Sequence, residues 1–144
     1  MASQAEQALA AGKALIDGLK RRDADAVIAL LHDDIVVEVA YPLIPGENTT
    51  GSRRSVGPAV HAYVRDARDR TAEMRFHDEV WRTTNDGLAV YQAEGDHVLS
   101  DGRAYRNHFL FFFEMADGKI IRWREYLSPV AAMRAFGGEL EAIP

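Results

Sequence analysis

The chain has 144 residues, of which 47% are hydrophobic and 27% are charged, and its formal net charge is −5. This composition is typical of a globular protein, and the length predicts one domain over residues 1–144 with a core large enough to enclose a small-molecule cavity. The sequence has no cysteine, which excludes a disulfide framework, a thiolate nucleophile and an iron–sulfur centre. The negative charge argues against nucleic acid and anionic membranes as partners.

The N-terminal residues 1–22 carry charges within their apolar stretch and lack the ordered regions of a signal peptide. No run of about 18 apolar residues occurs in the sequence, so no transmembrane helix is predicted. We therefore expect a cytoplasmic protein that does not insert into membranes.

Two helices and a strand are predicted up to Tyr41. From Ser3 to about Lys20, apolar residues recur at spacings of three and four, the pattern of an amphipathic helix. Asp23 can cap a second, shorter helix whose apolar face runs to Leu31. Residues 35–41 are rich in β-branched side chains and form the expected first strand.

A long loop and a third helix are predicted next. Residues 42–51 contain prolines, glycines and threonines, a composition that favours irregular structure. Ser55 is the expected N-cap of the third helix, which has Pro58 in its first turn. Its apolar face is predicted to hold Val56, Val60, Tyr63 and Val64.

Four strands are predicted over residues 72–84, 88–99, 103–115 and 119–127, where apolar residues alternate with a period of two. Each connector contains Asp-Gly, a dipeptide that suits tight turns with positive φ. Pro129 begins a last short helix that continues to about Phe136. Helices followed by hairpin-linked strands predict an α+β fold in which helices cover one face of an antiparallel sheet.

Both faces of the predicted strand 103–115 are apolar. Phe109, Phe111 and Phe113 lie on one face, and Leu110 and Phe112 lie on the other. Such a strand packs against helices on one side and against another sheet or subunit on the other. We therefore predict a homodimer formed through the sheet.

Glu125 interrupts an apolar row of the last strand and shares its face with Trp123. A carboxyl group in such a row loses solvation when it ionises, so its pKa should rise toward neutrality and permit proton transfer near pH 7. The residues alone leave a second interpretation open, in which Glu125 forms a salt bridge to Arg103 or Arg106 or lies near a sheet edge.

Other residues of the predicted strands are candidates for contacts with a ligand. Gln92 belongs to a row that is polar for a core face, which indicates either the wall of a wet cavity or a solvent-exposed face. Glu38 points either into the cavity of Glu125 or to a solvent edge. The remaining candidates for the pocket wall and for ligand contacts are aromatic: Trp123, Phe109, Tyr105 and Tyr41.

The five histidines form no HExxH or other close ligand pair. The sequence also has no glycine-rich phosphate loop and no G-x-S-x-G elbow. We therefore expect neither a metal site nor an organic cofactor. His61 on the third helix is a candidate proton carrier that faces the sheet, and a packed or surface histidine is the alternative.

The final strands carry three motifs: Tyr105-Arg106-Asn107-His108-Phe109-Leu110, Asp117-Gly118-Lys119-Ile120 and Arg124-Glu125-Tyr126-Leu127-Ser128-Pro129. They resemble the nuclear transport factor 2-like superfamily, and within it the SnoaL-like proteins and the phenazine-biosynthesis A/B family. This resemblance implies a curved antiparallel sheet wrapped by helices into a cone with a deep pocket, usually in a dimer.

The resemblance also implies roles for individual residues. It makes Glu125 the acid/base group and Tyr105 a ligand contact, and His61 is the nearest match to a histidine that the family uses in the helix after its first strand. Ser128 stands where many relatives have Asp or Asn. This difference argues against the aspartate mechanism of the SnoaL-type cyclases and ketosteroid isomerases.

Three hypotheses follow for the function. The first is a cofactor-independent isomerase, cyclase or condensation enzyme that acts on a cyclic or polycyclic carbonyl-type metabolite, with Glu125 as acid/base. The second is a non-catalytic module for binding a small ligand or for dimerisation. The third is hydrolysis of an epoxide or ester, which requires Glu125 or Glu94 to share a water with a second acidic group and an arginine.

Overall fold

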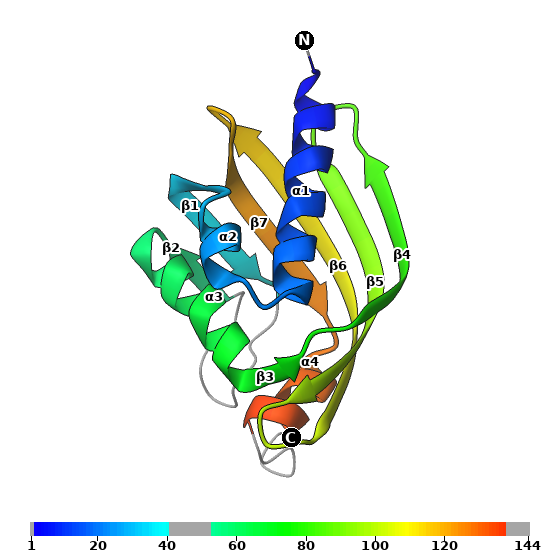
Figure 1. Ribbon diagram of the computed structural model, residues 1–144. Helices are drawn as coiled ribbons and strands as arrows, with labels where there is room; N and C mark the ends of the chain where they lie inside the picture. The colour runs from blue at the N-terminus through cyan, green and yellow to red at the C-terminus, as the bar shows by residue number, and fades with distance from the viewer. Residues whose placement is uncertain (1, 41–52, 138–144) are drawn as a thin grey trace.

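The computed structural model describes residues 2–40 and 53–137, which form helices packed on one face of a strongly curved sheet (Figure 1). Helix α1 (Gln4–Lys20) begins with a capping box between Ser3 and Glu6, and α2 (Ala24–Ile28) is capped by the Asp23 side chain. The chain continues through β1 (Leu31–Val39), β2 (Arg53–Val56) and α3 (Pro58–Arg70). The three helices and β1 agree with the predicted elements, except that the strand already starts at Leu31. Strand β2 was not predicted from the sequence.

The second half of the chain is a series of antiparallel strands. They are β3 (Thr71–Glu73), β4 (Phe76–Thr83), β5 (Ala89–Leu99), β6 (Ala104–Ala116) and β7 (Lys119–Leu127). The predicted strand 72–84 is therefore broken into β3 and β4, both of which pair with β5. After β7, α4 (Pro129–Ala132) runs into a π-helical turn over Met133–Gly137.

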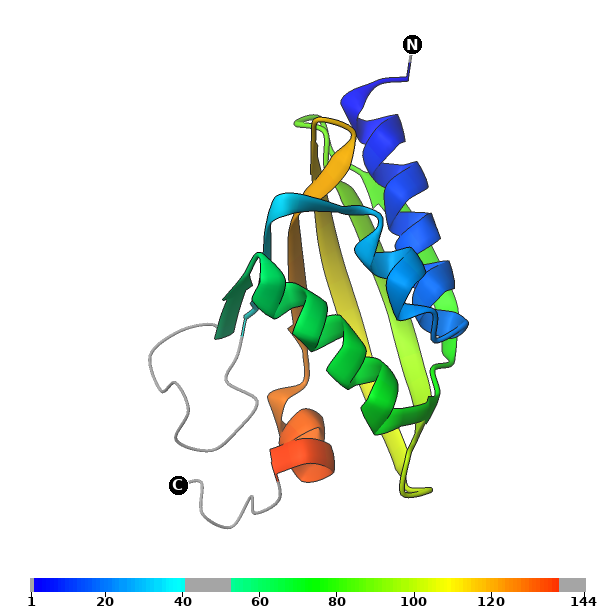
Figure 2. The ribbon, with the colours of Figure 1, turned by 60° about the vertical axis from the view of Figure 1, so that its left-hand side comes forward.

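The sheet has the strand order β2-β1-β7-β6-β5-β3, with β4 also paired to β5. The strand pairings in the described part of the chain are antiparallel, except that β1 and β7 pair in parallel. These two strands are neighbours in the sheet although β2 to β6 lie between them in the sequence. Helices α1, α2 and α3 lie on the concave side (Figure 2). The predicted α+β fold with a curved sheet wrapped by helices is thus confirmed.

Two turns connect this architecture directly to the sequence. The β6–β7 hairpin closes through Asp117 and Gly118, both at positive φ, as predicted for an Asp-Gly turn. Helix α3, by contrast, is preceded by Gly57 at φ 57°, and no side chain caps it. The prediction that Ser55 caps this helix was wrong, because Ser55 lies in β2 and pairs with Val37 of β1.

Alternation along the strands separates an inner face, toward the helices, from an outer face. Phe111 pairs with Glu125 and Phe113 pairs with Trp123 across β6 and β7, and all four side chains are buried. The predicted long loop over residues 42–51 and the candidate Tyr41 lie outside the described residues. Among the described helices, none is long and apolar enough to cross a membrane.

Candidate active site

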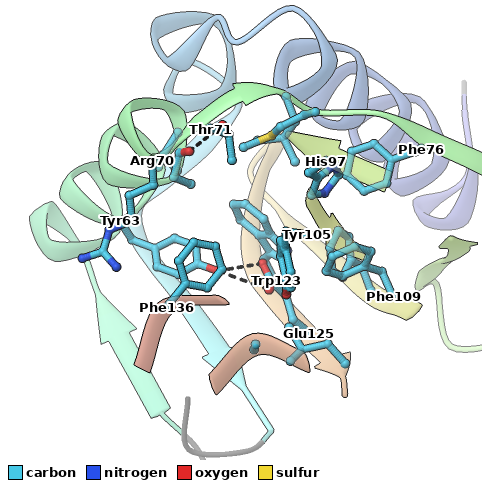
Figure 3. Close-up of a pocket in the computed structure, with 17 residues that line it drawn as sticks. Tyr63, Arg70, Thr71, Phe76, His97, Tyr105, Phe109, Trp123, Glu125 and Phe136 are labelled. Carbon is cyan, nitrogen blue, oxygen red and sulfur yellow. Dashed lines mark hydrogen bonds between the residues drawn. The ribbon is translucent and has the colours of Figure 1, made fainter. Parts of the chain in front are cut away.

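A cavity of about 130 Å³ lies between the inner face of the sheet, α3 and the C-terminal helical segment (Figure 3). Its walls are almost entirely apolar and aromatic. The residues that line it are Leu19, Tyr63, Val64, Ala67, Arg70, Thr71, Met74, Phe76, His97, Tyr105, Phe109, Phe111, Trp123, Glu125, Leu127, Ala132 and Phe136.

Glu125 is the carboxyl group of this cavity, and its residue is only 5% exposed. The Tyr63 hydroxyl donates to the carboxylate at 3.1 Å from Oε1 and 3.2 Å from Oε2. Burial raises the pKa of Glu125 to about 7, and the bond from Tyr63 opposes this rise because it stabilises the charged form. The alternative salt bridges are not formed, since Arg103 pairs with Asp101 and Arg106 with Asp96.

Tyr63 reaches the cavity because it shares the buried side of α3 with Val60 and Val64. Its ring also packs edge-on against Trp123, with centroids 6.0 Å apart. The sequence pattern had placed Tyr63 on this face without assigning it a role. His61 lies two positions away, is half-buried and is not part of the cavity wall, so the structure does not support its predicted position facing the sheet pocket.

Tyr105 is held at the cavity wall by a buried amide. Asn107 Nδ2 donates to the Tyr105 hydroxyl at 2.8 Å and to the Ser128 carbonyl at 3.1 Å, while Asn107 Oδ1 accepts from the Ser128 amide at 2.8 Å. Burial raises the pKa of Tyr105 to about 12. The phenol therefore stays protonated near pH 7, and it lines the cavity together with Trp123 and Phe109.

His97 is the histidine that lines the cavity, and the sequence analysis gave it no role. Its Nδ1 accepts a hydrogen bond from the Arg75 amide at 3.0 Å, and burial lowers its pKa to about 4. The signal that could have identified it is alternation, because it shares the inward row of β5 with Tyr91, Ala93 and Gly95.

Two predicted ligand contacts lie on the outer face and are corrected here. Gln92 is exposed. The odd-numbered residues of β5 point inward, and the polar row that contains Gln92 points outward. Glu38 points away from the cavity and pairs with Arg124 across β1 and β7, at 2.8 Å between Oε1 and Nε. Glu94 is also outside the cavity, where it pairs with His108 at 2.7 Å.

The titratable groups of the site are too few and too dispersed for a metal centre. In the part of the chain that the structure describes, no three or more His, Asp or Glu residues are grouped so that they could hold a metal ion. The cavity offers a buried carboxyl group, two phenols and a neutral imidazole within aromatic walls, and its wall also includes Arg70, which pairs with Asp66 at 2.8 Å. This set can move a proton and donate hydrogen bonds to an oxygen atom.

Comparison with known proteins adds a family to this geometry. Residues 13–123 match the model of the SnoaL-like domain. The uncharacterized protein YesE of Bacillus subtilis (strain 168) is 32% identical over 83 residues, and this match spans 56% of each chain, about half the length of that relative.

Solved structures share the fold at lower sequence identity. A proposed isomerase from Bacillus subtilis superposes with a TM-score of 0.81 at 22% identity, covering 96% of this chain and 98% of that chain. A phenazine biosynthesis-related protein from Pseudomonas aeruginosa gives a TM-score of 0.71 at 18% identity, covering 100% and 94%. The resemblance seen in the final strands is thereby confirmed at the level of family and fold.

Proposed function

The chain belongs to the SnoaL-like domain family, and we propose that it is a cofactor-independent acid/base enzyme. In this proposal Glu125 transfers a proton to and from a cyclic or polycyclic carbonyl-type metabolite bound in the cavity. The reaction is of the isomerase, cyclase or condensation type, all of which begin by moving a proton next to a carbonyl group.

One observation carries this proposal: Glu125 is buried in an apolar cavity, and its pKa is about 7. A carboxyl group with this pKa is present in both its protonated and its ionised form at neutral pH, so it can act as base and then as acid. Tyr63 holds both carboxyl oxygens and fixes their orientation. The apolar walls offer water few hydrogen-bond partners, so water competes less for the transferred proton.

The composition of the cavity disfavours hydrolysis of an epoxide or ester. That reaction would require a second acidic group beside Glu125, but Glu125 is the one carboxyl group among the described residues of the cavity wall. Glu94, the other candidate, pairs with His108 on the outer face. Proton transfer needs only the single carboxyl group that is present.

The experiment that tests this function is exchange of the protons next to the carbonyl of small cyclic ketones in D₂O, followed by NMR. A positioned general base is worth roughly 10²–10⁴-fold in rate, so Glu125→Gln should lose at least about 10²-fold of the catalysed exchange. Glu94→Gln, a matched change on the outer face, should leave the rate unchanged. An equal exchange rate in Glu125→Gln and the wild type would refute the assignment.

The alternative is a non-catalytic module that binds a small ligand. It predicts ligand binding with no exchange above the solution rate, and a Glu125→Gln variant that binds as well as the wild type. The exchange assay therefore separates the two functions without knowledge of the natural substrate.

We also propose that the protein forms a homodimer through the outer face of the sheet. The outer face carries the half-buried Leu110, Phe112 and Tyr126, whereas α1, α2 and α3 lie on the opposite face (Figure 2). Light scattering should give a dimer mass for the wild type, and Phe112→Lys should give a folded monomer. A monomeric wild type at micromolar concentration would refute this proposal.

A further inference from the structure

His97 is a buried side chain of the cavity to which the proposed function assigns no role. It is 5% exposed, its ring stacks on Phe109 with centroids 5.6 Å apart, and it meets Phe76 edge-on at 4.9 Å. In Figure 3 it lines the same pocket as Glu125, but it comes from β5, which is separated from β7 by β6.

The hydrogen bond to Nδ1 determines where the proton of this imidazole lies. Because the Arg75 amide donates to Nδ1, the neutral ring carries its proton on Nε2. Burial lowers the pKa of His97 to about 4, so the ring is uncharged at neutral pH. The result is a neutral N–H donor with a fixed tautomer.

This donor faces the cavity. Among the described residues, none accepts a hydrogen bond from His97 Nε2. Trp123 Nε1 is the one fully enclosed side-chain nitrogen or oxygen of these residues that has no partner. His97 Nε2 therefore retains accessible surface, although the residue as a whole is buried. Of the pockets in the described part of the structure, His97 lines only this cavity. Because Nε2 has accessible surface and His97 lines the cavity, a ligand bound there can supply the acceptor.

Tyr105 adds a second neutral donor beside the first. It pairs with His97 across β5 and β6, and their ring centroids are 5.9 Å apart. Since the Tyr105 hydroxyl accepts from Asn107 Nδ2, its own proton is available to a ligand. Two neutral donors on one wall are suited to an uncharged oxygen acceptor.

The size of the cavity gives a scale for the ligand. Its volume of about 130 Å³ is close to the roughly 150 Å³ of an apolar cavity that accepts benzene. The walls are flat aromatic rings, which favour a ring-shaped ligand. A single six-membered ring with one small substituent matches this volume.

We propose that the pocket selects an uncharged monocyclic compound by its carbonyl oxygen, which accepts a hydrogen bond from His97 Nε2. This inference rests on the proposed function, because the recognised carbonyl is the group whose neighbouring carbon exchanges a proton with Glu125. A hydrogen bond from His97 also stabilises the negative charge that develops on this oxygen when the proton leaves.

The test compares two ligands of equal shape, cyclohexanone and methylenecyclohexane, which differ in the carbonyl oxygen. Dissociation constants are measured by NMR titration for the wild type and for His97→Phe, which keeps a ring and removes the donor. The preference for the ketone should fall roughly tenfold in His97→Phe, the value of one buried hydrogen bond. His108→Phe on the outer face is the matched control and should leave the preference unchanged.

An unchanged preference in His97→Phe overturns the proposal, and so does a wild type that binds neither ligand. A loss of preference in Tyr105→Phe but not in His97→Phe also overturns it, because the phenol would then be the recognising donor. Should His97→Phe not fold, histidine labelled with ¹⁵N in the wild type decides the question. Its His97 Nε2–H resonance should shift with the ketone and stay in place with the hydrocarbon.

Failure of the proposed function gives a different pattern. If Glu125 is not the base, Glu125→Gln keeps the proton exchange, while the ketone preference still depends on His97. If Glu125 is the base but His97 does not bind the oxygen, Glu125→Gln loses the exchange and the ketone preference of His97→Phe equals that of the wild type.

Discussion

Replacing Glu125 with glutamine should change how the stability of the protein depends on pH. Burial raises the pKa of Glu125 from 4.5 to about 7. Because the folded pKa is above the unfolded one, the contribution of this group is fully present below pH 4.5 and is lost as the pH rises through 7. At about 1.36 kcal/mol for each pH unit, the loss is about 3 kcal/mol.

His97 acts in the opposite direction. Burial lowers its pKa from 6.5 to about 4, so its contribution is present above pH 6.5 and is lost as the pH falls through 4. The same arithmetic gives about 3 kcal/mol. In the wild type the two effects should nearly cancel between pH 4.5 and 6.5, and each variant should expose the effect of the group that remains.

Urea unfolding at a series of pH values checks this prediction. The free energy of unfolding should rise by about 3 kcal/mol from pH 4 to 6.5 in Glu125→Gln, relative to the wild type, and fall by about as much from pH 4.5 to 7 in His97→Phe. Glu94→Gln serves as control for a carboxyl on the outer face. The reasoning is refuted if Glu125→Gln and the wild type have parallel pH profiles, since the pKa of Glu125 would then be unperturbed.

Three further predictions follow from single contacts. Tyr63→Phe removes a hydrogen bond to the carboxylate, so the pKa of Glu125 should rise further, and the pH–rate profile of proton exchange should shift upward; an unshifted profile would contradict this role of Tyr63. Asn107→Ala leaves the Tyr105 hydroxyl and a backbone amide without partners and should cost about 1–3 kcal/mol in urea unfolding. Gly57→Ala places a side chain at φ 57° and should cost about 1–3 kcal/mol in urea unfolding, with α3 retained in the circular dichroism spectrum.

The sequence predicts best what depends on neighbouring residues. The Asp117-Gly118 turn closes the β6–β7 hairpin as predicted, but a register shift between Glu114 and Met115 changes the pairing beyond it. This shift places Trp123 opposite Phe113 and Glu125 opposite Phe111 on the inner face. Alternation places Glu125 in the same row as Trp123, but it does not show that this row faces the helices. Whether an arginine forms a salt bridge to Glu125 depends on the other strands. The sequence therefore left open whether Glu125 is an unpaired buried carboxyl group or a salt-bridged one.

The errors at the site have a common physical origin. Periodicity shows which residues share a face, but it does not show which face the helices cover. Gln92 and His97 lie on opposite faces of β5, and the concave side proved to be that of His97. On α3 the apolar spacing predicts that Tyr63 faces the sheet, and Tyr63 lines the cavity whereas His61 does not. Here the spacing agrees with the structure better than the choice of His61 by resemblance to the family. The parallel pairing of β1 with β7 joins distant segments, for which no local signal exists.

Burial in an apolar cavity raises the pKa of Glu125 and lowers the pKa of His97. In both cases it favours the neutral form, because the cavity solvates charge poorly. Near pH 7 the imidazole is uncharged, and the carboxyl group lies near its midpoint. The cavity can therefore give or take one proton at little energetic cost. Acid/base chemistry on an uncharged ring is what such an environment permits.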